Sequence, residues 1–182
     1  ASIDFTNEYW FRGIPQEDQG QIIQPGLDLG FSLISNDDFT LDAYVGTWNS
    51  IHFDGPADDA AAGSAEAWFE ADWYAGLTFG FGNLSLDVSY IILYGPNVGG
   101  TFAEEVDVAV AYDDSGMWGD GFLASGLQPY VLIAFETQAG SDFGAAAAVQ
   151  DEGIYLEIGI EPSWTIIESE EYPITLAVPI YA

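Results

Sequence analysis

The sequence predicts an all-β protein, and the main observation is a strict alternation of apolar and polar residues. Residues 69–81 alternate without a break, with apolar side chains at the odd positions and Glu70, Asp72 and Thr78 among the even ones. Residues 84–92 follow the same pattern. Because successive side chains of a strand point to opposite faces of a sheet, these two sets separate into an apolar face and a polar face. No stretch has the apolar period of an amphipathic helix.

The second observation is the charge of the chain. Thirty Asp and Glu residues stand against one Arg (Arg12), one His (His52) and no Lys, which gives a formal net charge of −29. Phosphate backbones are bound through Lys and Arg, so this composition excludes nucleic acid as a partner and favours divalent cations. No run of about 18 apolar residues is present, so we expect no transmembrane helix, and only β-structure could place the chain in a bilayer.

Nine segments are expected to form strands, joined by short turns and longer loops as in up-and-down barrels. We therefore predict an antiparallel up-and-down β-barrel of about 8–10 strands, with residues 1–182 as a single domain. The alternative is a β-sandwich with an exposed or exchanged edge strand, because nine is an odd number and Pro173 and Pro179 favour an edge position. The expected strands are residues 3–11, 22–34, 39–51, 67–81, 84–95, 102–113, 122–138, 144–162 and 173–181.

Carboxylates on the polar phase of these strands predict an acidic interior. Arg12 follows an aromatic cluster at the end of the first strand, and we expect it to anchor carboxylates such as Asp4, Glu8, Asp28 or Asp42 through bidentate hydrogen bonds. The predicted lumen or selectivity residues are Arg12, Asp42, Glu70, Asp72, Asp87, Asp107, Glu136 and Glu157.

Acidic residues also gather in the predicted loops, where oxygen-rich segments with glycine suit Ca²⁺, which takes about 6–8 oxygen ligands. None of these loops has the EF-hand spacing, and solvated loop charge is the alternative interpretation. The candidate calcium ligands are Asp54, Asp58, Asp59, Asp113, Asp114 and Asp120.

The residues do not predict an enzyme. Nucleophilic catalysis would need a serine held near His52 with an orienting acid, and Ser50 is only a sequence neighbour of that histidine. A lone His without Cys lacks the usual zinc ligands. Glu70 and Asp72 share a face and could in principle serve a glycosidase, but so many acids together indicate a hydrated, cation-filled interior.

Aromatic residues make up 15% of the chain, and many fall near predicted strand ends. Aromatic girdles at a membrane boundary have this distribution, and so does the core of a soluble sandwich. Strand length and the polar opposite faces favour a girdle. Its expected members are Trp48, Trp68, Trp73, Trp118, Tyr44, Tyr74, Tyr90 and Tyr94.

Two stretches carry a resemblance to a known family. Residues 9–13 contain a Tyr-x-x-Arg-Gly strand end, followed by a Gln- and Asp-rich loop, and residues 45–50 read Val-Gly-Thr-Trp-Asn-Ser. Together with residues 153–159 and 176–179, they resemble an uncharacterised family of bacterial proteins regarded as outer-membrane β-barrels. The resemblance implies the barrel fold and no catalytic role. Family members usually continue with a further hairpin, so the resemblance also implies that the barrel of residues 1–182 lacks a C-terminal hairpin.

We therefore expect a non-enzymatic outer-membrane β-barrel with an acidic lumen and acidic loops, acting as a cation-favouring pore or as a subunit of a larger envelope assembly. The alternative is a secreted β-sandwich subunit of a calcium-linked extracellular polymer, assembled by strand exchange. A chain that begins Ala1-Ser2 matches what a signal peptidase leaves, so we expect export to the bacterial outer membrane or cell surface. The expected partners are outer-membrane lipid or partner subunits and divalent cations, with Ca²⁺ as the one candidate cofactor.

Overall fold

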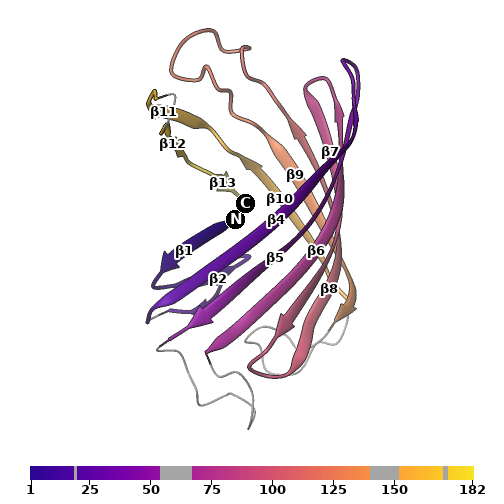
Figure 1. Cartoon of the computed structure of the whole chain (residues 1–182), viewed down its shortest axis with the longest axis vertical. Helices are drawn as coiled ribbons and strands as arrows, with labels where there is room; N and C mark the ends of the chain where they lie inside the picture. The colour runs from indigo at the N-terminus through magenta and orange to yellow at the C-terminus, as the bar shows by residue number, and fades with distance from the viewer. Residues whose placement is uncertain (19, 54–66, 140–151, 170–171) are drawn as a thin grey trace.

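A single curved sheet dominates the computed structural model, which describes residues 1–18, 20–53, 67–139, 152–169 and 172–182. Figure 1 shows how the long strands curl around a common interior. The sheet has nine strands, and two further hairpins lie beside it. The strands of the large sheet are β1 (Ser2–Thr6), β4 (Ile22–Ser35), β5 (Thr40–His52), β6 (Trp68–Phe81), β7 (Leu84–Gly95), β8 (Gly100–Tyr112), β9 (Tyr130–Ala139), β10 (Ile154–Ile160) and β13 (Ile180–Tyr181).

Neighbouring strands of this sheet are antiparallel throughout, in the order β1-β4-β5-β6-β7-β8-β9-β10-β13. The predicted all-β, antiparallel class is therefore confirmed. Nine alternating strands leave the two outermost ones, β1 and β13, pointing in the same direction. No hydrogen-bonded pairing joins β1 to β13 among the described residues, so the sheet is open along that seam.

Three of the predicted strands, 3–11, 122–138 and 173–181, differ from the observed ones, and the third is divided by a proline as described below. The segment 3–11 is divided into β1 and β2 (Tyr9–Phe11), and the predicted loop 13–21 contains β3 (Ile14–Glu17), which pairs with β2. The segment 122–138 begins only at Tyr130, because the residues before it form turns. Part of the segment 144–162 lies outside the described residues.

Prolines divide the last hairpin. Strands β11 (Ser163–Ile167) and β12 (Ile174–Ala177) pair with each other, and they continue the hairpin of β10 and β13. The interruption falls at Pro162 and Pro179, and the amide of Val178 donates to the carbonyl of Pro162 across it at 3.0 Å. Proline has no amide hydrogen for a ladder, so its place on this edge agrees with the sequence-based expectation.

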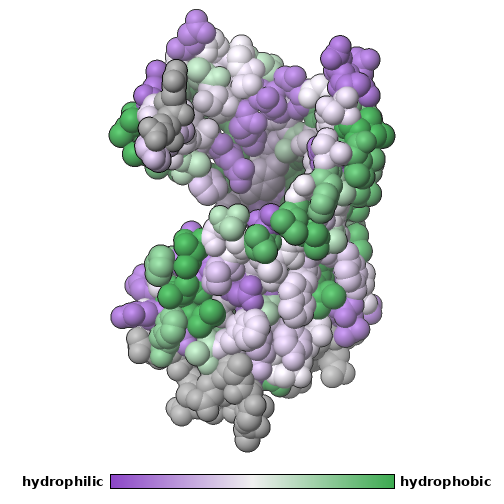
Figure 2. Space-filling model, viewed as in Figure 1, coloured by the Kyte–Doolittle hydropathy of each residue, from purple (hydrophilic) through white to green (hydrophobic). Residues whose placement is uncertain are grey.

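The two faces of the sheet differ in chemistry. One apolar row crosses the sheet from β4 to β10, with each residue the Cα partner of the next: Leu29, Val45, Ala75, Tyr90, Val106, Phe135 and Ile154. These residues lie on the outer face, where large side chains such as Phe31 and Leu156 are 56% and 54% exposed. Figure 2 shows apolar residues along the outside of the sheet and hydrophilic residues lining the hollow that faces the viewer. No helix among the described residues is long and apolar enough to cross a membrane.

Candidate functional site

The inner face of the sheet carries the carboxylates that the sequence predicts there. Asp42 is the Cα partner of Thr78, and Thr78 is the partner of Asp87, so all three lie on one row. Asp107 and Glu136 lie on the same face in the next strands, through their registers with Ser89 and with Glu105. Glu70, Asp72 and Glu157 complete the set on β6 and β10.

Tyrosine hydroxyls donate hydrogen bonds to several of these carboxylates. Asp87 accepts from Tyr44 at 2.8 Å, and Thr78 donates to its other oxygen at 2.7 Å. Glu157 accepts from Tyr130 at 2.7 Å and from Tyr155 at 2.6 Å. A carboxylate bonded through both oxygens is held in one orientation, so the inner face is an ordered polar lining.

Glycines opposite the tyrosines make room for the rings. Tyr44 is the Cα partner of Gly76, and Tyr74 is the partner of Gly46 on the same two strands. A Cβ atom at Gly76 would lie 2.5 Å from the ring of Tyr44, and one at Gly46 would lie 2.3 Å from the ring of Tyr74. Sequence analysis missed this packing, although the spacing Tyr-x-Gly occurs on both strands and would have indicated it.

The hairpin of β2 and β3 turns at Arg12 and Gly13, within the motif that carries the family resemblance. Both residues have positive φ angles, 49° and 77°, and they join Phe11 to Ile14, which are Cα partners. A two-residue hairpin loop with two positive φ angles is a type I′ turn. Glycine adopts such a conformation readily, but an L-residue such as arginine does not.

Arg12 reaches from this turn to the wall of the sheet. Its guanidinium donates to both oxygens of Glu105 on β8, at 2.7 and 2.6 Å, in a bidentate pair. The bidentate geometry was expected, but the partner is Glu105 and none of the expected Asp4, Glu8, Asp28 and Asp42. The same group lies 4.3 Å from the ring centroid of Tyr155 on β10 and 4.8 Å from that of Phe11. The Glu105 side chain is only 3% exposed, so the pair is largely removed from water.

Tyr9 attaches the other side of the hairpin. Its hydroxyl donates to Glu70 on β6 at 2.7 Å, and Glu70 is fully buried. The ring of Tyr9 packs against Trp48, with 5.5 Å between centroids, and against Phe69. Beneath the hairpin, Phe11 packs on a small apolar cluster of Leu93, Phe102 and Ala103.

The surroundings of Arg12 and Tyr9 keep both side chains in the protonated states in which they donate hydrogen bonds to the wall of the sheet. Burial alone would lower the pKa of the Arg12 guanidinium, but its hydrogen bonds to Glu105 and the charge of that carboxylate raise the pKa above its usual value. Burial, together with the neighbouring charge of Glu70, raises the pKa of the Tyr9 hydroxyl. Tyr9 is therefore a neutral donor at physiological pH, and Arg12 is a permanent cation.

Ser50, His52 and Glu17 lie in line beside the hairpin, an arrangement that sequence analysis considered unconvincing. Ser50 Oγ is 2.8 Å from His52 Nε2, whereas His52 Nδ1 is 3.9 Å from a Glu17 oxygen. That second distance exceeds hydrogen-bond range, and Ser50 is fully buried. The order of groups matches a serine hydrolase, but no substrate can reach this hydroxyl in the conformation described.

Some buried carboxylate oxygens of the inner face accept no hydrogen bond from the described residues. They belong to Glu70, Asp72 and Asp107. Oxygens of this kind can accept from water or contact a hydrated cation. No group of three or more His, Cys, Asp or Glu side chains within the described ranges is arranged to hold a metal ion.

The acidic loop at residues 113–129 uses its aspartates internally. Asp114 accepts from the indole of Trp118 at 2.6 Å and from the amides of Leu127 and Gln128 at 2.8 Å. Partial burial opposes its ionisation, but these hydrogen bonds dominate and lower its pKa. Asp113 accepts from the Ser115 amide at 2.9 Å.

Asp120 is exposed, and the candidate ligands Asp54, Asp58 and Asp59 lie outside the described residues. Calcium binding therefore stays a prediction.

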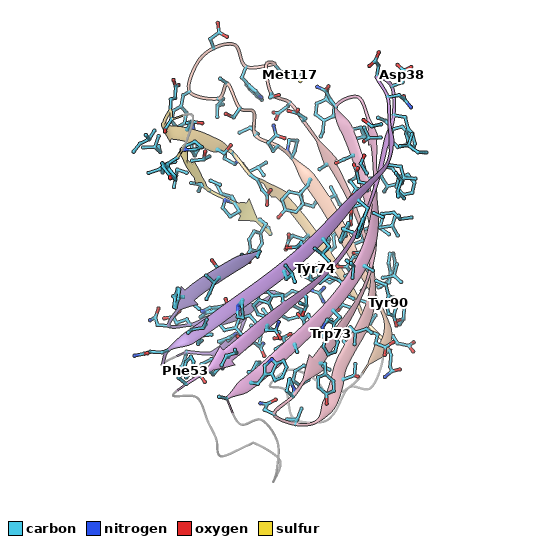
Figure 3. All side chains as sticks on the ribbon, viewed as in Figure 1. Asp38, Phe53, Trp73, Tyr74, Tyr90 and Met117 are labelled. Atoms are coloured by element: carbon cyan, nitrogen blue, oxygen red, sulfur yellow. The ribbon has the colours of Figure 1, made fainter. Side chains whose placement is uncertain are left out.

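The predicted aromatic girdle is divided between the two faces. Tyr44 and Tyr74 lie on the inner face, as described above, and Trp48 packs there on Tyr9. Trp73 and Tyr90 lie on the outer face, where they are 50% and 40% exposed. Figure 3 labels Trp73 and Tyr74, neighbours in sequence that belong to opposite faces. Trp68 and Tyr94 share the outer face with Trp73, whereas Trp118 belongs to the loop at 113–129.

Comparison with known proteins gives one family. A family model described as a bacterial protein of unknown function (Gcw_chp) matches residues 1–116, whereas neither the curated proteins nor the solved structures give a match. The matched span includes the hairpin β2–β3 and the strands from β1 to β8. Because it covers well over half of the 182 residues, the chain belongs to the Gcw_chp family of bacterial proteins.

Proposed function

We propose that this protein is a β-barrel of the bacterial outer membrane whose acidic interior favours the passage of cations. The observation that carries the proposal is the unbroken apolar row across the outer face, from Leu29 to Ile154, opposite an inner face of carboxylates. A soluble sheet would cover such a face with a second layer, and none lies on it among the described residues. Lipid is the environment in which an exposed apolar face of this extent is stable.

The strands have the length that a membrane requires. Strand β6 has 14 residues. At about 3.3 Å per residue it extends about 45 Å, which becomes about 35 Å across a sheet tilted by about 40°. That span exceeds an apolar band of about 25 Å. Exposed aromatic rings occur toward both ends of the outer face, Trp68 and Trp73 at one end and Phe81 and Tyr112 at the other.

Cation preference follows from the charges of the interior. Carboxylates line the inner face on β5 to β10, whereas Arg12 is the one strong cation of the chain and is already paired with Glu105. Rings of Asp and Glu favour cations in pores because they lower the energy of a positive ion and repel anions. Across a salt gradient, the voltage at which the current is zero should therefore have the sign expected for a cation-selective pore.

The test compares adjacent residues of β6 on opposite faces. Leu77 is 40% exposed on the outer face, and Thr78 lies on the inner face beside Asp87. Leu77→Arg should weaken insertion into lipid vesicles by about 2–4 kcal/mol, whereas Thr78→Arg should insert normally and lower the cation selectivity. Equal insertion of both variants, or a wild-type protein that stays in the soluble fraction, would rule out the proposal.

A second candidate function draws on the open seam. Strands β1 and β13 are edges of the sheet, and Phe5 on β1 and Ile180 on β13 are 73% and 57% exposed. Unpaired edges can accept strands of another molecule, so an extracellular polymer with calcium between acidic subunits is the alternative. Detergent-free particles that dissociate when calcium is chelated would favour the polymer, and detergent dependence unaffected by chelation would favour the barrel.

A further inference from the structure

The hairpin of β2 and β3 lies inside the curve of the large sheet without belonging to it. It forms its own two-stranded sheet, and no strand pairing joins it to the nine-stranded one within the described residues. Its side chains contact Glu70 on β6, Glu105 on β8 and Tyr155 on β10. Those strands lie on different parts of the wall, so the hairpin crosses the interior, near the lower end in Figure 1.

We propose that this hairpin is a movable plug of the interior, and that the pair of Arg12 and Glu105 is the latch that keeps it closed. The inference rests on the proposed pore function, because it assigns the element that regulates passage through the pore. The hairpin can leave the interior without breaking a strand pairing of the large sheet, because no pairing joins the two among the described residues and the chain connects them only through the segments after β1 and before β4. The latch would then decide how often the lower end of the interior is open.

The turn itself does not explain an arginine at position 12. Asparagine or glycine is the favoured residue at a positive φ in a type I′ turn, and Arg12 holds a φ of 49°. A non-glycine residue in a sparsely populated conformation persists where surrounding contacts require it. Here the contacts are the two hydrogen bonds to Glu105 and the ring of Tyr155.

The latch is strong while it is intact and fails when one partner is lost. Glu105 is 2% exposed, so its charge depends on the guanidinium for compensation. Removing one member of a buried ion pair leaves an uncompensated charge in a poorly solvated place, which strongly destabilises that arrangement. The hairpin would therefore move away from Glu105 and admit water to the carboxylate.

Space for this movement lies beside the pair. A cavity of about 170 Å³ is lined by Arg12, Glu105, Glu136, Gly153 and Tyr155 among others. The released guanidinium can turn into it without displacing the sheet. The contact between hairpin and wall is thus incompletely packed on the side of the latch, whereas Tyr9 and Phe11 are packed on the other sides.

The experiment measures amide hydrogen exchange of residues 9–17, except Pro15, in the purified protein. Arg12→Asn removes the latch but suits the turn, because asparagine tolerates a positive φ. We expect these amides to exchange at least about tenfold faster than in the wild type, with the amides of β4 to β8 unchanged. Asp87→Asn is the matched control, because it also removes a charge from the inner face, but Asp87 accepts its hydrogen bonds from Tyr44 and Thr78, which lie on β5 and β6 and not on the hairpin. Unchanged exchange in Arg12→Asn would overturn the latch.

A charge swap separates the latch from general damage. Glu105→Arg alone should release the hairpin, and Arg12→Glu combined with Glu105→Arg should restore slow exchange by forming the pair in reverse. Equal exchange in the single and double variants would contradict the latch.

Conductance in planar bilayers tests the pore separately. A rise in conductance for Arg12→Asn over the wild type supports both proposals, and equal conductance despite faster exchange contradicts the plug. If neither protein conducts, the pore and the regulation assigned to it both fail, whereas the exchange measurement still decides whether Arg12 holds the hairpin.

Discussion

The inner face has two regions that combine tyrosines and carboxylates in opposite surroundings. At the lower end, Tyr9 donates to Glu70, which is fully buried under the hairpin. Toward the middle, where Figure 3 labels Tyr74, that tyrosine donates to Asp28 at 2.5 Å in an exposed hydrogen bond. Both are tyrosine–carboxylate pairs, but Glu70 is enclosed beneath the hairpin that carries Tyr9, whereas Asp28 is exposed.

The difference shows what the large sheet cannot do alone. A single curved sheet leaves its inner face hydrated unless something fills the interior, and most buried side chains of the described residues surround the hairpin at the lower end. The apolar cluster of Leu93, Phe102 and Ala103 lies there as well. We therefore expect substitutions at the lower end to have larger effects on stability than equivalent substitutions in the middle.

Truncation of a ring should have the largest effect. Phe102 is 8% exposed and belongs to the apolar cluster under the hairpin, whereas the Tyr44 ring lies against Gly76 on the half-buried middle of the face. Phe102→Ala should lower the free energy of unfolding by about 3–4 kcal/mol, because it removes buried apolar surface and leaves a cavity. Tyr44→Ala should lower it by about 2 kcal/mol, because it removes one hydrogen bond to Asp87 and the contacts of a ring that is only half-buried. Urea titration measures both, and equal losses would show that the two regions are packed alike.

Added volume should have an intermediate effect. A Cβ atom at Gly95 would lie 2.2 Å from the ring of Phe102 and 2.7 Å from Val98, so it meets groups on two sides. At Gly76 the three atoms nearest to the added one all belong to the side chain of Tyr44, which is half-buried on the inner face. Overpacking of a confined site costs about 1–3 kcal/mol, so we expect Gly95→Ala near 2–3 and Gly76→Ala near 1 kcal/mol.

Gly30→Ala is the control for this pair, because a Cβ atom there meets nothing within 4 Å. Its free energy of unfolding should equal or slightly exceed that of the wild type, since alanine restricts the unfolded chain more than glycine does. A large loss for Gly30→Ala would mean that backbone freedom, and not contact with a ring, governs the glycines of this face.

Alternation in the sequence was sufficient to predict the long strands of the sheet and the faces of most carboxylates. The period of two fixes which side chains share a face, so Asp42, Asp87 and Asp107 lie where expected. It fails where a bulge changes the register. Between β5 and β6 the register shifts after Ser50, and Phe69, expected on the apolar outer phase, stacks instead on His52 with 4.5 Å between centroids.

The hairpin could not be predicted from the same pattern. Its strands are three and four residues long, too short for alternation to be recognised. The turn residues Arg12 and Gly13 also lack the Asn-Gly signal of a type I′ turn, and the side chain of Arg12 pairs with Glu105 on β8. The candidate plug is thus the part of the molecule where tertiary contacts override local preference.

Removal of a single hydroxyl should have the smallest effect and tests the comparison most directly. Tyr9→Phe keeps the ring contacts but leaves a Glu70 oxygen buried without its donor, so we expect a loss of about 1–2 kcal/mol in the free energy of unfolding. Tyr74→Phe leaves Asp28 able to bond to water, and the loss should stay below about 0.5 kcal/mol. The ratio of the two losses measures how dry the lower end is, because the bonds removed are of the same type. Equal losses would mean that water reaches Glu70 despite the hairpin, and the hairpin could not then act as a plug.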